Sequence, residues 1–233
     1  MFTHAFSKIR DLSHLFFPHN CLGCFSDVLS PDQFLCAACF FKLPETGFFK
    51  HPENAMEKIF YGRLPVQHAG SAYYFNHDSI LHRLVIQFKY QGRKDIGDYL
   101  GKLLCKELIL SMRYDNLDAV IAMPLNKARE KIRGFNQSSV LAKKIAQSLQ
   151  IPLLENVLER KINTQSQTTK GRIARWENMQ NNFIVIDPKP LENKHILLVD
   201  DIITTGATLE ACGMEILKTN NSKLSIATLG FTV

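Results

Sequence analysis

The chain of 233 residues lacks several features that define common functional classes. It has no run of about 20 apolar residues, the length that a membrane-spanning helix needs. Its first residues include Lys8, Arg10 and Asp11 within an amphipathic pattern, which does not fit a secretory signal peptide. No Gly-x-x-x-x-Gly-Lys-Ser/Thr motif occurs, which argues against a P-loop NTPase. These absences favour a cytoplasmic protein that does not enter the membrane.

The sequence also lacks an obvious platform for nucleic acid, because no stretch interleaves aromatic with basic residues. The composition is otherwise ordinary for a soluble protein, with 45% hydrophobic and 21% charged residues. The length suffices for one domain with a sizeable core plus a small module. The net charge of +6 favours anionic ligands, either nucleotides or nucleic acid, although a mildly basic surface without a function would give the same value.

One stretch combines a strand, an acid pair, a hydroxyl-rich turn and a helix. Residues 196–199 are apolar, as in a strand buried on both faces of a parallel sheet. Asp200 and Asp201 follow, then a loop rich in Thr and Gly, then a helical pattern over 207–218. The N–H groups at a helix start bind phosphate, while sugar hydroxyls or Mg²⁺ suit a carboxylate pair. An ordinary capped helix after a strand is the alternative interpretation.

The same stretch carries a resemblance to a known family. Residues 199–208, Val-Asp-Asp-Ile-Ile-Thr-Thr-Gly-Ala-Thr, closely resemble the phosphoribosyl-pyrophosphate (PRPP) signature of type I phosphoribosyltransferases. In that family the acid pair contacts the ribose hydroxyls, directly or through Mg²⁺, and the loop holds the 5′-phosphate. The resemblance therefore implies PRPP binding by Asp200, Asp201, Thr204, Thr205, Gly206, Ala207 and Thr208.

Four of the six cysteines form two Cys-x-x-Cys pairs, Cys21 with Cys24 and Cys36 with Cys39. Four thiolates satisfy tetrahedral Zn²⁺ and leave no open coordination position. Disulfides are the alternative, but a cytoplasmic location disfavours them, and a redox dithiol would need only one pair. We therefore expect one structural zinc ion at these four cysteines.

A basic run follows the second predicted buried strand, residues 118–125. Its members are Lys127, Arg129, Lys131 and Arg133, and the run ends in Arg-Gly-Phe-Asn-Gln at residues 133–137. Ligands of α/β proteins bind at the carboxyl ends of strands, which favours a binding role for these cations. A solvated basic helix face is the alternative.

Periodicity predicts the remaining elements. We expect a strand over 69–75, a helix capped by Asn76 or Asp78 that ends near 90–92, a helix over 96–112, a helix reaching about 150, and strands over 183–186 and 224–231.

As a whole, the chain resembles the ComF family of competence-related, phosphoribosyltransferase-like proteins. The resemblance rests on the cysteine module, the PRPP signature and residues 133–137. It implies an α/β fold in which a Rossmann-like parallel sheet is flanked by helices. Residues 46–233 would form this type I phosphoribosyltransferase domain, and residues 1–45 an N-terminal helix with the zinc module.

The family resemblance also implies roles for particular residues. Pro124 and Leu125, with Lys127, would form the pyrophosphate loop, and residues 160–175 would form a lid. The zinc module and residues 40–75 would stand in the place of the hood that selects the acceptor base. The catalytic roles would fall to Asp200, Asp201 and Arg133.

Three functions remain open from the sequence. The first is transfer of a phosphoribosyl group from Mg²⁺–PRPP to a nitrogenous acceptor. The second is a non-catalytic sensor of PRPP or a related nucleotide, since no base-selecting residue is recognisable. The third is a DNA-uptake protein that binds single-stranded DNA or a protein of the competence machinery. The oligomeric state, including a homodimer, is also open.

Overall fold

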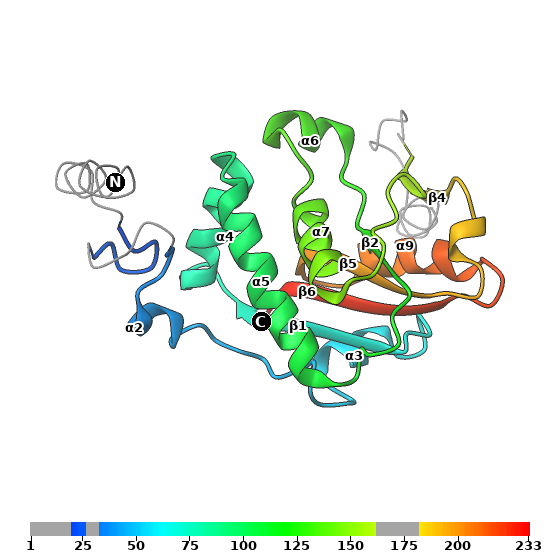
Figure 1. The fold of residues 1–233 in the computed structure, drawn as a ribbon, viewed down its shortest axis with the longest axis horizontal. Helices are drawn as coiled ribbons and strands as arrows, with labels where there is room; N and C mark the ends of the chain where they lie inside the picture. Colours follow the sequence, from blue (N-terminus) through cyan, green and yellow to red (C-terminus); the bar gives the residue numbers. More distant parts are fainter. Residues whose placement is uncertain (1–19, 27–32, 162–181) are drawn as a thin grey trace, which may run out of the picture.

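The computed structural model describes residues 20–26, 33–161 and 182–233, which form three layers with a sheet in the middle (Figure 1). The predicted helix over 2–17 and all of the predicted lid beyond Lys161 lie outside these residues. Within the described ranges, no helix combines the length and the apolar character needed to cross a membrane.

The central sheet has four parallel strands in the order β1-β6-β5-β2. Its strands are β1 (His68–Phe75), β2 (Ala119–Ala122), β5 (His195–Ile203) and β6 (Lys223–Thr232). Strand β5 is an inner strand, pairing Ile196 with Ala119 of β2 on one side and with Leu224 of β6 on the other. The acid pair therefore leaves the sheet from an inner strand.

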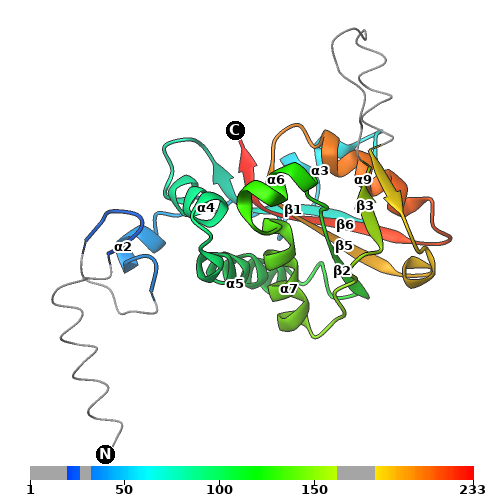
Figure 2. The same cartoon turned by 90° about the horizontal axis from the view of Figure 1, so that it is seen from above.

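Helices cover both faces of this sheet, as Figure 2 shows from above. One face carries α4 (Ile80–Tyr90), α5 (Lys94–Ser111) and α7 (Gln137–Leu149). The other carries α3 (Ala55–Phe60) and α9 (Ala207–Leu217). Leu197 and Val199 of β5 pack in the first core, and Ile196 and Leu198 in the second, all without exposure to solvent. The predicted strand buried on both faces is thus confirmed.

The helices that follow the adjacent strands β2 and β5 lie on opposite faces of the sheet. Helix α7 follows β2 and packs on one face, whereas α9 links β5 to β6 on the other face. The segments that follow β2 and β5 therefore diverge at the carboxyl ends of these adjacent strands. In α/β sheets this divergence opens a crevice, which is the usual place for a ligand.

The remaining elements are short. They are α2 (Ala37–Phe40) in the cysteine module, α6 (Lys127–Arg133) after β2, the 3-10 helix η1 (Lys189–Leu191), and the antiparallel pair β3 (Leu158–Arg160) and β4 (Phe183–Val185). The basic run is therefore helical, with no buried residue, and Asn126 caps it by accepting from Ala128 N at 2.9 Å.

Two sequence expectations were wrong in this region. Neither Asn76 nor Asp78 caps α4. The cap is Ser79, whose hydroxyl accepts from His82 N at 3.0 Å. The Asn76 carbonyl accepts a hydrogen bond from the Ser79 hydroxyl, and this turn delays the start of the helix. Residues 68–75 do not belong to a hood, because they form β1, an edge strand of the central sheet.

The described part of the cysteine module packs against α5. Leu35 and Cys39 are buried in the same core as Leu100 and Leu104 of α5, and the Phe34 ring lies 5.2 Å from that of Tyr99. The module thus extends the helical layer beyond α4, on the side away from β2 (Figure 1).

Candidate functional site

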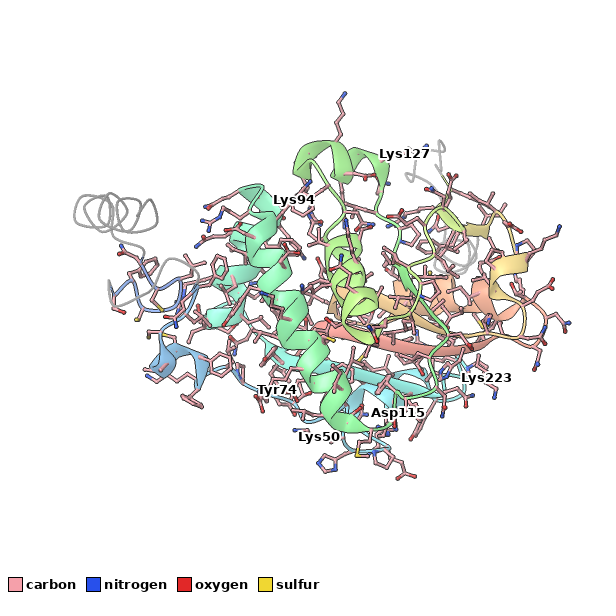
Figure 3. The ribbon with its side chains drawn as sticks, viewed as in Figure 1. Lys50, Tyr74, Lys94, Asp115, Lys127 and Lys223 are labelled. Carbon is pink, nitrogen blue, oxygen red and sulfur yellow. The ribbon has the colours of Figure 1, made fainter. Side chains whose placement is uncertain are left out.

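A cavity of about 420 Å³ opens at the carboxyl ends of β2 and β5. The structure brings most of the predicted residues to it. Those that line it are Pro124, Leu125, Arg133, Asp200, Asp201, Thr204, Thr205, Gly206, Ala207 and Thr208. Lys127 is the exception. It lines a neighbouring cavity of about 350 Å³, because it occupies the first position of α6, at the outer end of the molecule in Figure 3.

The two carboxylates of the acid pair have different partners. Asp200 Oδ1 accepts from Ser138 Oγ at 2.8 Å and from Asp201 N at 2.9 Å. Asp201 Oδ1 accepts from Ile202 N at 2.6 Å, and its Oδ2 lies 2.6 Å from Lys89 Nζ. Among the described residues, no side chain or N–H donates to Asp200 Oδ2. Asp200 lines the cavity, so a cation or a hydroxyl that reaches this oxygen has no donor of the described chain to displace.

Burial disfavours a negative charge on Asp200 in addition to the charge of Asp201. Burial, and after it the nearby charge of Asp201, raises the pKa of Asp200 to about 7. The hydrogen bond from Ser138 opposes this rise without cancelling it. A cation or hydroxyl donors bound beside the pair would therefore relieve a repulsion that the protein alone leaves in place.

The turn before α9 has the form of an anion site. Gly206 has a φ of +74°, and a Cβ at this position would lie 2.7 Å from Ile59 Cγ2 of α3. The N-cap residue Gly206 has no side-chain acceptor for the eleven-residue helix that follows, and among the described residues only the Thr205 hydroxyl, 3.5 Å from Ala207 N, accepts from its first N–H group. The hydroxyl-bearing residues Thr204 and Thr208 are exposed. The first N–H groups of α9 and the helix dipole therefore face the cavity without a strong protein acceptor.

Several cationic side chains line the same cavity. Arg129, Arg133, Arg160 and Lys89 come from α6, β3 and α4. The Arg133 guanidinium donates to Gln137 Oε1 at 2.9 Å and lies 5.6 Å from the centre of the Tyr90 ring. Positive charge from three separate elements thus faces the acid pair and the α9 turn.

Lys89 and Ser138 are the contacts of the acid pair that sequence reasoning missed. Lys89 lies in an amphipathic helix without a local motif, so nothing in its neighbourhood distinguishes it from a surface lysine. Ser138 follows the Arg-Gly-Phe-Asn-Gln run directly, and this position was the available signal.

The four predicted metal ligands lie together in a second place. The Sγ atoms of Cys21, Cys24, Cys36 and Cys39 all lie within 4.8 Å of one another, and Cys24 and Cys36 are 3.8 Å apart. Zinc–thiolate bonds of about 2.3 Å in a tetrahedron give sulfur separations of about 3.8 Å. The N–H groups of Gly23 and Cys36 also donate to Cys21 Sγ, at 3.4 and 3.2 Å. The cluster is therefore compatible with a zinc ion.

The raised pKa of Asp200 leads to a pH-dependent prediction. Between pH 4 and pH 7 the folded protein holds a proton at Asp200 that the unfolded chain releases, so this residue lowers stability as the pH rises. Asp200→Asn keeps the Oδ1 acceptor and removes the charge. We expect it to raise the free energy of unfolding at pH 8 by about 1–2 kcal/mol, and by much less at pH 5.

Thermal unfolding at the two pH values tests this, with a shift of about 2–4 °C expected per kcal/mol. Asp115→Asn is the control. Asp115 is an exposed aspartate, and it lies at the opposite end of the molecule from Lys127, which lines the cavity next to the site (Figure 3). An equal effect of Asp200→Asn at pH 5 and pH 8 would contradict the assignment.

A match to one domain family agrees with the observed fold. The family model of the phosphoribosyl transferase domain matches residues 136–230, which include β5, the acid pair and the α9 turn. Solved structures with partial similarity include a glutamine PRPP amidotransferase from Bacillus subtilis (17% identity, 61% of this chain and 30% of that one, TM-score 0.43). Another is a purine phosphoribosyltransferase from Pyrococcus horikoshii (20% identity, 57% and 74%, TM-score 0.37).

The similar curated proteins carry names related to competence and DNA use. Competence protein F of Haemophilus influenzae is 26% identical over 212 residues, covering 83% of this chain and 89% of that protein. DNA utilization protein YhgH of Escherichia coli K12 is 28% identical over 146 residues, and Competence protein ComFC of Bacillus subtilis 27% over 137. These two matches cover 61% and 58% of this chain, and 63% and 52% of the relatives' lengths. Taken with the domain match and the cysteine cluster, these similarities support a ComF-family, phosphoribosyltransferase-like protein.

Proposed function

We propose that the chain binds PRPP with Mg²⁺ in the cavity between β2 and β5 and transfers the phosphoribosyl group to a nitrogenous acceptor, releasing pyrophosphate. The observation that carries this proposal is the set of residues that line one cavity. The acid pair, the uncapped start of α9 and three arginines all line the same space of about 420 Å³.

Each part of PRPP has a matching part of the cavity. The 5′-phosphate would accept hydrogen bonds from the N–H groups and hydroxyls of residues 204–208. The ribose diol would donate to the carboxylates of Asp200 and Asp201. The pyrophosphate would extend toward Pro124 and Leu125, where Arg129 and Arg133 supply positive charge.

The reaction itself needs little from the protein beyond positioning and charge. The acceptor nitrogen would form a bond to the anomeric carbon as the bond from that carbon to the pyrophosphate oxygen breaks. The bonding electron pair leaves with pyrophosphate, and the nitrogen loses its proton to solvent. Arg133 would stabilise the negative charge that develops on the leaving group.

The donor set also fits a magnesium ion. Carboxylate oxygens are the ligands that Mg²⁺ prefers, and Asp200 Oδ2 has no donor among the described residues. Mg²⁺, when bound with PRPP, would neutralise part of the pyrophosphate charge. Asp200 and Asp201 are the residues that would hold it.

Pyrophosphate release from Mg²⁺–PRPP, in the presence of a mixture of purine and pyrimidine bases, tests this function. We expect release that depends on a base and that Asp201→Asn lowers at least about 100-fold, because the diol loses an acceptor. Asp115→Asn, which replaces an exposed acid outside the cavity, should leave the rate unchanged. Binding of PRPP without release would favour the sensor instead, and absence of PRPP binding would contradict both functions.

We also propose that Cys21, Cys24, Cys36 and Cys39 hold a structural zinc ion, in a module formed by residues 1–45 next to a transferase domain of residues 46–233. Four thiolates within 4.8 Å of one another support the ion, since their charges need a cation.

Metal analysis of the purified protein tests the zinc site. We expect about one zinc ion per chain in the unchanged protein. Cys21→Ser should lose the ion and lower the unfolding temperature, whereas Cys105→Ala, at a buried cysteine of α5 outside the cluster, should keep the metal. A native protein without metal, or a Cys21→Ser protein with its full zinc content, would contradict the site.

A second candidate function, binding of single-stranded DNA, is favoured by a row of cations over aromatic rings. Its four pairs are Arg133 over Tyr90 at 5.6 Å, Lys94 over Phe135 at 5.4 Å, Arg93 over Phe34 at 5.9 Å and Lys106 over Phe40 at 5.8 Å. This cation–aromatic row joins Arg133, which lines the cavity, with residues of the cysteine module, and includes Lys94 at the start of α5 (Figure 3). Its members come from separate segments, so no single stretch of the sequence displays the row.

Such a row offers both requirements for binding a single strand, positive charge for the backbone and rings on which bases stack. The Tyr90 ring is 64% exposed, so a base can reach it. The names of the relatives, which refer to competence and DNA use, agree with this second candidate.

Fluorescence anisotropy of a labelled oligothymidine tests the row at low and moderate salt. We expect Tyr90→Ala to weaken binding about tenfold, and Asp201→Asn to leave it unchanged. Tyr61→Ala, which removes a comparably exposed tyrosine at the C-cap of α3, is the matched control. Equal effects of the two tyrosine variants would contradict a DNA surface at this row.

A further inference from the structure

The cavity holds an ion pair that the proposed transfer reaction does not require. Lys89 Nζ lies 2.6 Å from Asp201 Oδ2, and the two side chains are only 15% and 14% exposed. With Asp201 Oδ1 accepting from Ile202 N, both oxygens of Asp201 have partners within the chain. A ligand that needs Asp201 Oδ2 therefore meets a lysine already bound to it.

The helix that carries Lys89 is firmly held, so the ammonium can leave Asp201 only through a change of the side-chain conformation. Phe88, the preceding residue, is fully buried, and its ring would lie only 2.3 Å from a Cβ at Gly97 of α5. The Phe88 ring also lies 5.5 Å from that of Phe135, the residue before the α7 cap Asn136. The backbone at Lys89 is thus fixed between α5 and the segment before α7. Only the four-carbon stem of Lys89 remains to move the ammonium.

A divalent cation and the ammonium cannot share Asp201 Oδ2. Mg²⁺ binds carboxylate oxygens at about 2.0–2.1 Å, which would put it within a few ångströms of Nζ. Two like charges at that separation repel strongly in a partly buried site. A divalent cation that binds Asp201 Oδ2 therefore requires the stem of Lys89 to swing into the rest of the cavity.

We propose that Lys89 is the built-in counter-ion of the acid pair and that it competes with the divalent cation for Asp201. This inference rests on the proposed function for the identity of the ligand. In the ligand-free protein the ammonium compensates Asp201 and keeps metal affinity low. When Mg²⁺ arrives with PRPP, Lys89 leaves Asp201 and contacts the anionic ligand beside Arg129 and Arg133, which line the same cavity. The site thereby favours the metal–PRPP complex over free metal.

Manganese binding without PRPP, followed by calorimetry or electron paramagnetic resonance, tests this role. We expect Lys89→Met to bind Mn²⁺ at least about tenfold more tightly than the unchanged protein, because the acid pair loses its counter-ion. Lys89→Arg retains a cation and should keep the low affinity. Asp201→Asn combined with Lys89→Met should remove the gain.

Lys102→Met is the matched control, since Lys102 is an exposed lysine of α5 outside the cavity and its loss changes the net charge equally. Unchanged Mn²⁺ affinity in a folded Lys89→Met protein would overturn the proposal. So would an equal gain in Lys102→Met.

A measurement on the unchanged protein covers the case in which Lys89→Met does not fold. Acetylation of lysines, followed by mass spectrometry, should modify Lys89 slowly in the free protein and several-fold faster with saturating Mn²⁺ alone. An unchanged rate would show a permanent structural ion pair and overturn the proposal. Since neither experiment contains PRPP, their outcome is independent of whether the transfer reaction occurs.

Discussion

The repulsion between Asp200 and Asp201 is the interaction on which the arrangement of the site depends. Two successive carboxylates at the end of a buried strand need positive charge or protons nearby. The structure supplies Lys89 to one carboxylate, and the Ser138 hydroxyl and a backbone N–H to the other. Lys89 and Ser138 come from α4 and α7, so two helices on one face of the sheet position side chains against the pair. Burial, and after it the charge of Asp201, still raises the pKa of Asp200, and a bound cation or hydroxyl would stabilise its charged form.

The sheet places that acid pair where the chain diverges. Strand β5 is apolar toward both helical layers, which fixes its place inside the sheet and its register with β2 and β6. The helices that follow β2 and β5 lie on opposite faces, and the cavity lies between the β2 and β5 loops. Gly206 then brings the start of α9 against Ile59 of α3, so the turn before α9 is supported by the second layer.

The parts of the site that are contiguous in sequence could be predicted, and the parts assembled from distant segments could not. Residues 196–209 carry their own signals, since apolar strand, acid pair, Gly-containing turn and helix follow one another. Lys89 reaches Asp201 because tertiary packing, in which Phe88 takes part, brings their helix and strand together. The cation–aromatic row likewise combines residues from four separate segments. Neither feature has a local pattern in the sequence. The assignment of residues 68–75 to the hood was wrong for a similar reason, because this strand pairs with the last strand of the chain and no neighbouring signal reveals the pairing. The four cysteines lie together as predicted, because the spacing within each Cys-x-x-Cys pair is a local signal.

The central claim is that one cavity recognises a phosphorylated ribose through the acid pair and the α9 turn. A crystal structure of the protein with ribose 5-phosphate and Mn²⁺ tests it most directly. We expect the phosphate within hydrogen-bonding distance of the N–H groups of residues 205–208, and the ribose diol beside Asp200 and Asp201. A sugar phosphate bound elsewhere, or a cavity that stays empty at saturating ligand, would contradict it.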